Sequence, residues 1–308
     1  MAIAVKTEGL TKTYRLLMHK EPVSAVSDLD LEVCEGEIFG FLGPNGAGKT
    51  TTIKILLGLT YPTSGKAWLL GKPIGDISVK REISYLPESP YFYEYMSGAE
   101  LLDFYARLFG LDGRSRKQKV EDLLKTVGLY ADRHKPLSQY SKGMLQRIGL
   151  AQALINGPKL LLFDEPTSGL DPIAHSEIRD LILRLRDEGR TVFLSSHQLS
   201  DVEMVCDRVA ILNRGKLLKV GKLDELLHGG SVEIKAAGVP AAAVEKLRGV
   251  AGYVEMENGS VTASMDEGGA VNQAIDIIRA AKGQILTVAP KRRTLEDLFM
   301  EIIREENK

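Results

Sequence analysis

The sequence has 308 residues, of which 44% are hydrophobic and 26% are charged, and its formal net charge at pH 7 is −1. This length suits one large domain with a smaller one, and the composition is typical of a globular protein with a packed core. Basic residues are not in excess, so nucleic acid is not expected as a main partner. The sequence has no block of acidic residues that would indicate a disordered tail.

The cysteines, the first residues and the hydropathy of the chain bear on its location in the cell. The cysteines, Cys34 and Cys206, lack the spacing of a disulfide framework or a zinc site, so reduced thiols in a cytosolic protein fit them better. The first ten residues lack the apolar core of a signal peptide. No stretch approaches the ~18 apolar residues that cross a bilayer. We therefore expect a soluble chain that reaches any membrane through a partner.

The first quarter of the chain predicts strands around one helix. Apolar and polar residues alternate over 2–8 and 25–33, and 37–42 is a short apolar run. A helix is expected from about 48 to 59, and a further strand over 66–70.

The middle of the chain changes from helical to alternating patterns. From about 97 to 128, apolar residues recur at helical spacing between charged ones, which predicts an inserted helical subdomain. An amphipathic helix is expected over 141–156. A buried strand at 159–163, a helix at 172–188 and a strand at 191–195 follow. This alternation indicates a mostly parallel sheet covered on both faces.

A break in composition at His228-Gly229-Gly230 separates the C-terminal part. The elements expected after it are strands and helices over 232–236, 241–247, 253–257, 261–264, 271–281, 285–288 and 295–304. Their order predicts a small α+β domain over 231–308 with a core of its own, following a main domain over 1–228.

A glycine-rich motif lies where a strand should end and a helix begin. Residues 43–51, Gly-Pro-Asn-Gly-Ala-Gly-Lys-Thr-Thr, match G-x-x-x-x-G-K-[ST]. Its glycines allow successive N–H groups to face one concavity that binds phosphate oxygens, and the helix adds its positive end. The residues expected to bind nucleotide are Gly43, Pro44, Asn45, Gly46, Ala47, Gly48, Lys49, Thr50 and Thr51. Lys49 supplies a point charge for the β- and γ-phosphates and Thr50 a hydroxyl for Mg²⁺. A chance match is the alternative, and the strand–turn–helix context speaks against it.

Two acids and a histidine follow neighbouring predicted strands. Asp164 and Glu165 end the apolar strand, at the sheet edge where the glycine-rich loop also lies. Asp164 is suited to Mg²⁺, and Glu165 to accepting a proton from the attacking water or orienting it. His197 follows the next strand. From there its imidazole can hydrogen-bond the γ-phosphate, although a histidine after a buried strand is often purely structural.

Ser141 and Gly143 begin a predicted helix. A serine at this position usually only caps the helix, but a helix N-terminus is also an anion site. Ser141 lies 92 residues beyond Lys49, with the helical insert between them. If it cannot fold back onto its own glycine-rich loop, it can serve the loop of a second copy.

Together these segments resemble the ATP-binding subunits of ABC transporters, over residues 3 to about 225. The matching motifs are Walker A at 43–51, Walker B at 160–165, the signature at 141–146, the D-loop at 168–171 and the switch histidine at 197. Tyr14 falls where the family stacks an aromatic ring on adenine, with a strand-edge tyrosine as the alternative.

The resemblance implies an α/β fold: a P-loop NTPase core with a mostly parallel sheet, an antiparallel N-terminal β subdomain and a helical insert at about 90–157. It implies ATP and Mg²⁺ as ligands. Two copies, or one copy and a close homologue, would enclose two ATP molecules, with Ser141 and Gly143 of each completing the site of the other. Closure would drive a separate transmembrane permease subunit, which places the chain at the cytoplasmic face of the cell membrane.

The sequence departs from the family at two places. Glu88 stands where the family often has a glutamine that contacts Mg²⁺ and links to the membrane subunit. A carboxylate can still reach Mg²⁺, so Glu88 joins Thr50 and Asp164 as a candidate ligand, but its charge alters the balance around the γ-phosphate. In the signature, Lys142 and Met144 replace the usual Gly and Gln. Ser141 and Gly143 are retained, and we expect function to survive both changes.

The tail favours one branch of the family. Residues 290–302, which include Leu-Glu-Asp-Leu-Phe, loosely resemble the ending common in exporter ATPases of the drug, sodium and polysaccharide groups. This favours export over import. A soluble relative acting in translation or DNA repair would usually carry two ATPase units or a long coiled-coil insert. A regulatory module without turnover is disfavoured by Glu165 and His197. A neighbouring gene for a protein of about six transmembrane helices would favour the transporter.

Overall fold

The computed structural model describes residues 2–15, 22–227, 231–257, 259–266, 269–291 and 293–306, and divides the chain into two compact units. The first comprises residues 1–223 and 302–308, and the second residues 224–301. This division differs from the expected domains 1–228 and 231–308 at both ends. The last helix, α10 (Leu295–Glu306), is divided between the two units, because the first unit includes the residues from 302 onward. Leu295, at the start of the helix, is buried. Glu306, at its end, accepts a hydrogen bond from Asn213, and both residues belong to the first unit.

An antiparallel sheet begins the first unit. Its order is β2-β1-β4-β5, with β1 (Ile3–Tyr14), β2 (Val23–Cys34), β4 (Ser64–Leu69) and β5 (Lys72–Pro73). Along β2, Leu29, Leu31 and Val33 are buried while the residues between them are exposed, because successive side chains of a strand face opposite sides. This sheet is the predicted antiparallel subdomain, with strands longer than the alternating stretches.

A six-stranded sheet forms the centre of the same unit. Its order is β10-β9-β3-β8-β7-β6, from β3 (Ile38–Leu42), β6 (Ile83–Leu86), β7 (Leu160–Asp164), β8 (Thr191–Ser196), β9 (Arg208–Asn213) and β10 (Lys216–Lys222). All pairs are parallel except β9–β10. Strands β3, β7 and β8 are buried throughout, as expected for a sheet covered on both faces. The rings of Phe39 and Phe41 pack on Phe193, with centroids 5.8 and 5.1 Å away.

Helices join and cover these sheets. α1 (Lys49–Leu56) contacts β2 and β4 of one sheet and β7 of the other, so it lies between them. α5 (Pro172–Asp187) packs on β8, and α6 (Leu199–Val205) packs on β3 and β8. Two short 3₁₀ turns, η1 (Ile77–Arg81) and η2 (Leu137–Gln139), complete the connections.

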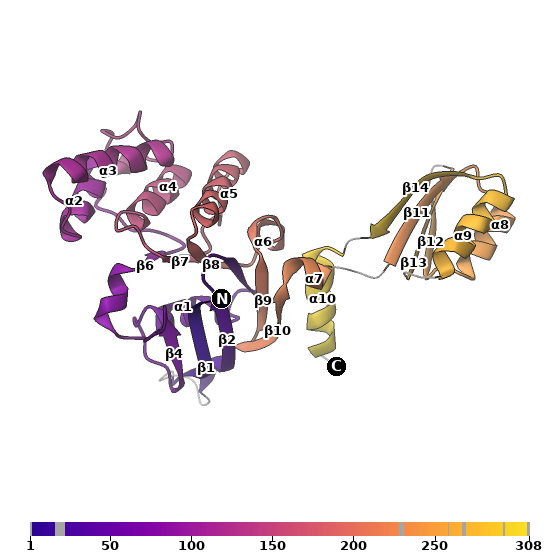
Figure 1. The fold of residues 1–308 in the computed structure, drawn as a ribbon, viewed down its shortest axis with the longest axis horizontal. Helices are drawn as coiled ribbons and strands as arrows, with labels where there is room; N and C mark the ends of the chain where they lie inside the picture. Colours follow the sequence, from indigo (N-terminus) through magenta and orange to yellow (C-terminus); the bar gives the residue numbers. More distant parts are fainter. Residues whose placement is uncertain are drawn as a thin grey trace. The chain divides into compact units, whose positions relative to one another are not determined.

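The predicted helical insert is a separate group of helices. α2 (Gly98–Leu108), α3 (Gly113–Thr126) and α4 (Lys142–Ala153) contact one another, as Figure 1 shows. α2 begins with a capping box, because the Ser97 hydroxyl accepts from the Glu100 N–H while the Glu100 carboxylate accepts from the Ser97 N–H.

The second unit has the order β-α-β-β-α-β, the split βαβ arrangement. After α7 (Leu223–Leu227) its elements are β11 (Ser231–Ala237), α8 (Ala241–Arg248), β12 (Tyr253–Glu257), β13 (Ser260–Asp266), α9 (Gly269–Ala280) and β14 (Gln284–Lys291). The strands form one antiparallel sheet in the order β12-β13-β11-β14. Its core, which includes Ile234, Leu247, Ala263 and Ile278, is separate from that of the sheets above. The expected α/β class with a small α+β unit is confirmed.

Among the described helices, none contains a stretch long and apolar enough to span a bilayer.

Candidate nucleotide-binding site

The glycine-rich loop joins β3 to α1, and its path requires glycine. Gly48 has a φ of 104°, and a Cβ there would lie 2.2 Å from the Ala25 carbonyl oxygen of β2. A Cβ on Gly43 would lie 2.6 Å from the Leu212 carbonyl oxygen. The turn between β9 and β10 also reaches Ala25, because a Cβ on Gly215 would lie 3.0 Å from the same oxygen. Substitution at Gly48 would therefore move the loop itself.

The Lys49 ammonium is buried at the floor of this loop. Its Nζ donates to the Gly43 carbonyl at 2.7 Å and to the Pro44 carbonyl at 3.3 Å. It also lies 3.2 Å from Glu165 Oε1. Lys49 and Glu165 are only 6% and 7% exposed. A cation at the start of a helix, surrounded by backbone amides, provides a centre for phosphate oxygens.

Asp164, at the end of β7, receives two hydroxyl groups. Thr50 Oγ1 donates to Asp164 Oδ1 at 3.1 Å, and Ser195 Oγ donates to the same oxygen at 2.6 Å. Burial, with the nearby charges of Asp164 and Glu88, raises the pKa of Tyr85 to about 12. These hard oxygens in an acidic region fit Mg²⁺, which is often held by one or two carboxylates, water and substrate phosphates. Among the described residues, no group of three or more His, Cys, Asp or Glu forms a complete metal cage.

Glu165 and His197 meet across the ends of β7 and β8. Glu165 Oε2 lies 2.7 Å from His197 Nδ1 and accepts from the His197 backbone N–H at 3.2 Å. The Glu165 backbone has a φ of 50°, an unusual conformation for a residue with a side chain. Its N–H donates to the Ser195 carbonyl at 3.1 Å and lies 3.3 Å from the Ser195 hydroxyl. These bonds hold the carboxylate between Lys49 and the imidazole.

One cavity of about 350 Å³ is lined by residues of the glycine-rich loop together with Glu165 and His197. Its lining is Ala25, Asn45, Gly46, Ala47, Gly48, Lys49, Thr50, Thr51, Glu88, Glu165, Ser168 and His197. Glu88 is held loosely, with its Oε1 3.5 Å from the Ser168 hydroxyl. Most of the predicted loop residues, the predicted acid–histidine pair and the candidate ligands Thr50 and Glu88 thus share one space.

Six predicted residues lie outside this lining. Gly43, Pro44 and Asp164 adjoin it, because Lys49 donates to the Gly43 and Pro44 carbonyls and Thr50 donates to Asp164. The other three are Ser141, Gly143 and Tyr14. Ser141 is the N-cap of α4, where its Oγ accepts from the Met144 N–H at 3.2 Å. Gly143 is buried against α5, because a Cβ there would lie 2.8 Å from the Ala174 Cβ. Tyr14 ends β1, with the Lys12 ammonium 4.9 Å from its ring centroid. The structure does not bring these three residues to the nucleotide cavity of the same chain.

Comparison with known proteins decides the family. The ABC transporter family model matches residues 26–168. An uncharacterized ABC transporter ATP-binding protein of Synechocystis sp. is 40% identical over 99% of this chain and 86% of its own length. The chain belongs to the ATP-binding proteins of ABC transporters. The prediction of an ABC-type subunit that binds and hydrolyses ATP is confirmed.

Further relatives of this ABC ATPase include one named for its cargo. The bacitracin transport ATP-binding protein BcrA of Bacillus licheniformis is 41% identical over 73% of this chain and 72% of its own length. Among solved structures, the dimeric ATP-binding cassette MJ0796, in a post-hydrolysis state bound to ADP and Pi, is similar. Its TM-score is 0.65 at 26% identity, over 71% of this chain and 98% of that one.

The sequence interpretation missed two residues of the site: Ser195 bonds Asp164, and Ala25 lines the cavity. Ser168, which contacts Glu88, begins the D-loop motif at 168–171. Ser195 could have been noticed, because two serines end the buried strand before His197, where polar groups at a sheet edge face a ligand. Ala25 carries no local signal, since its role depends on the approach of β2 to the loop.

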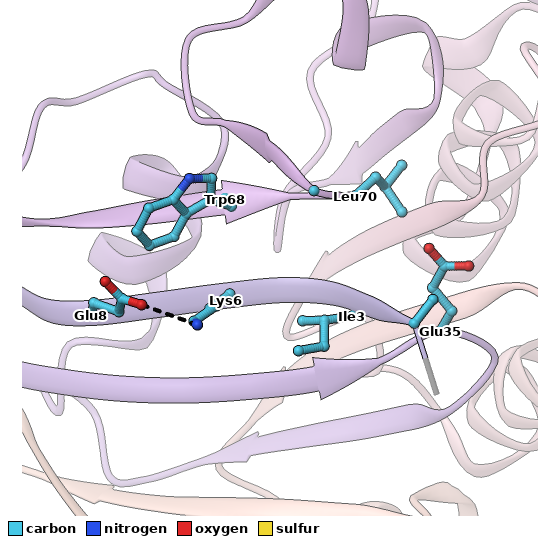
Figure 2. Close-up of a pocket in the computed structure, with 8 residues that line it drawn as sticks. Ile3, Lys6, Glu8, Glu35, Trp68 and Leu70 are labelled. Atoms are coloured by element: carbon cyan, nitrogen blue, oxygen red, sulfur yellow. Dashed lines mark ion pairs between the residues drawn. The ribbon is translucent and has the colours of Figure 1, made fainter.

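The ABC ATPase has a larger cavity, of about 550 Å³, on the antiparallel sheet. Figure 2 shows its lining, with Trp68 and Leu70 beside Ile3 and Lys6 of β1, and Lys6 paired with Glu8 at 3.0 Å. This cavity contains none of the phosphate-binding or acidic residues described above. Chemistry, rather than size, therefore makes the smaller cavity the candidate nucleotide site.

Proposed function

We propose that this chain is the ATP-driven motor of an ABC exporter, in which two copies close over two ATP molecules and drive a separate permease. The observation that carries the proposal is the contact chain Lys49–Glu165–His197 inside the cavity of the glycine-rich loop. An ammonium, a carboxylate and an imidazole in contact provide phosphate binding, water activation and a group that responds to the γ-phosphate.

Each residue has a distinct task in this proposal. Lys49 and the loop amides bind the β- and γ-phosphates, and Glu165 orients the attacking water and takes its proton. His197 keeps Glu165 in place and contacts the γ-phosphate. Thr50 and Asp164, with Glu88 as a further candidate, would hold Mg²⁺, which would neutralise charge on the phosphates. The hydrogen bond from Thr50 to Asp164, and the cavity lining shared by Lys49, Glu88, Glu165 and His197, support these roles.

The second copy is supported by the residues outside the cavity. Ser141 and Gly143 begin α4, which offers N–H groups and the positive end of a helix dipole. Because they do not line the cavity of their own chain, we assign them to the nucleotide of the partner copy. The similar cassette MJ0796 is a dimer bound to ADP and Pi, which supports this assignment. Tyr14 is proposed to stack on adenine.

The permease contact is proposed for the loop that follows Glu88. Between β6 and α2 this loop carries Tyr91, Tyr93 and Tyr95, which are strongly exposed at 96%, 57% and 79%. Exposed aromatic residues are typical of interfaces. Such a contact would hold the chain at the membrane, on the cytoplasmic face in this proposal. Export, as opposed to import, is supported by the tail sequence.

Glu165→Gln tests the proposal directly. The amide keeps the size of the side chain but cannot take a proton, so we expect ATP turnover to fall by ~10² or more while ATP stays bound. The variant should then form a stable dimer with saturating Mg-ATP, measured by size-exclusion chromatography with light scattering. Lys49→Ala is the control for binding, and we expect it to lose nucleotide affinity and turnover.

Two results would contradict the proposal. Wild-type turnover in Glu165→Gln would remove the carboxylate from catalysis. A Glu165→Gln protein that binds Mg-ATP but stays monomeric would contradict the enclosure by two copies.

The membrane role has a test of its own. The chain should co-purify with a permease of about six transmembrane helices encoded by a neighbouring gene, and cargo movement into or out of vesicles should depend on ATP.

A further inference from the structure

A second polar cluster lies beside the catalytic contacts and is not part of them. Asp201 Oδ2 accepts from Thr167 Oγ1 at 2.8 Å and lies 2.7 Å from His175 Nε2. Gln198 Oε1 is also 3.4 Å from His175 Nε2. We call Thr167, His175 and Asp201 the Asp201 junction.

The junction joins three segments that are separate in sequence. Thr167 comes two residues after Glu165, His175 lies in the first turn of α5, and Asp201 lies in the first turn of α6, four residues after His197. One carboxylate oxygen therefore ties the chain leaving Glu165 to the chain leaving His197. None of the three residues lines the nucleotide cavity.

Burial makes these contacts specific. Thr167 and Asp201 are buried, and His175 is half-buried. A carboxylate removed from water requires partners for its charge, and here a hydroxyl and an imidazole provide them. Loss of either partner would leave the other side of the junction with a poorly satisfied buried group.

The segment from 165 to 171 depends on such anchors. It starts at Glu165, in a left-handed conformation, and ends at Asp171, whose carboxylate caps α5 by accepting from the Ile173 and Ala174 N–H groups at 3.0 Å. Within it the Ser168 N–H donates to the Glu165 carbonyl at 3.1 Å. The Thr167 hydroxyl links the middle of this segment to α6.

We propose that the Asp201 junction is a positioning device for hydrolysis. It fixes Glu165 relative to His197 and sets the course of residues 168–171. The inference rests on the proposed roles of Glu165 and His197. Since the junction does not touch the nucleotide cavity, its loss slows turnover and leaves ATP affinity nearly unchanged.

Thr167→Val and Thr167→Ser form the decisive pair. Valine keeps the shape of threonine but removes the hydroxyl, whereas serine retains it. We expect Thr167→Val to lower kcat about tenfold, with KM and the Kd for ATP within about twofold, as for loss of a hydrogen bond to a charged group. Thr167→Ser should stay within about twofold of wild type. Thr126→Val, on the exposed end of α3, is the matched control and should leave kcat unchanged.

His175→Ala tests the other arm of the junction. If both residues act through Asp201, the double variant Thr167→Val/His175→Ala will be slowed less than the product of the two single effects. Thermal unfolding and ATP titration of each variant show that the fold and binding are intact. Multiplicative effects of the two changes would separate the residues and overturn the proposal.

Two other results would overturn it as well. Wild-type kcat in Thr167→Val would show that the hydroxyl has no part in turnover. Equal slowing in Thr167→Val and Thr167→Ser would assign the effect to packing. Glu165→Gln, assayed in parallel, distinguishes failure of the junction proposal from failure of the catalytic proposal. If it is inactive while Thr167→Val is normal, the junction proposal fails and the catalytic proposal stands; if Glu165→Gln turns over normally, the catalytic proposal itself fails.

Discussion

At the scale of single residues, the site concentrates opposite charges where water is scarce. The Lys49 ammonium and the Glu165 carboxylate form a buried pair, and each has additional hydrogen bonds. A buried pair of this kind is tolerated only when its remaining polar atoms are satisfied, and removal of one partner is strongly destabilising. A substitution that keeps the size of a side chain at the edge of the site is therefore more informative than one that removes the Lys49 or Glu165 side chain.

Glu88→Gln is such a change, because it keeps an oxygen ligand and removes one negative charge. We expect the affinity for ATP to remain within a few-fold of wild type, because Thr50 and Asp164 already supply oxygens. Titration with a fluorescent nucleotide, with and without Mg²⁺, measures the effect. Glu94→Gln, an exposed change in the same loop, is the control. Complete loss of binding only in Glu88→Gln would show that the carboxylate is an obligatory ligand.

At the scale of elements, caps define where the helices of the insert begin. Ser97→Ala removes the hydroxyl that accepts from the first turn of α2. We expect a loss of about 1 kcal/mol in the free energy of unfolding, as for other N-cap serines. Thermal unfolding should show a melting temperature lower by roughly 2–4 °C. Ser97→Thr restores a hydroxyl, so equal melting of the alanine and threonine variants would contradict the cap.

The same scale shows what local sequence predicts. Residues 43–51 predict the glycine-rich loop, because the glycines, the lysine and the threonine of the motif are themselves the residues that bind phosphate. The apolar runs before Asp164 and His197 predict that these residues follow buried strands. The hairpin of β9 and β10 was not predicted, although its turn has a local signal in Arg214-Gly215, both with positive φ.

Tertiary contacts account for what the sequence could not indicate. Asp201 looks like an ordinary acidic residue in the first turn of a helix, a common place for one. Only the packing of α5 and α6 shows that it meets Thr167 and His175. Likewise, the sequence pattern predicts a last helix in the C-terminal domain, but it does not show that Glu306 meets Asn213.

At the scale of the whole molecule, each unit has its own buried core. Leu247→Ala removes a fully buried side chain from the C-terminal core, which should cost about 2–5 kcal/mol. Calorimetry should show that unfolding of this unit moves to lower temperature, whereas ATP binding by the other unit is retained. Leu286→Ala, at a position 53% exposed in the same unit, is the control. A matching loss of ATP affinity in Leu247→Ala would show that the units do not fold independently.

The carbonyl of Ala25 has a wider consequence. A strand of one sheet, the loop of Gly48 and the hairpin turn of Gly215 all converge on this single oxygen, with no room for a methyl group at Gly48. Evolution can therefore hardly alter one of these segments alone. Gly215 lies outside the cavity lining, yet a side chain there would approach the Ala25 carbonyl oxygen that also lies against Gly48. We therefore expect that, among related sequences, changes at Gly215 accompany changes in the nucleotide site.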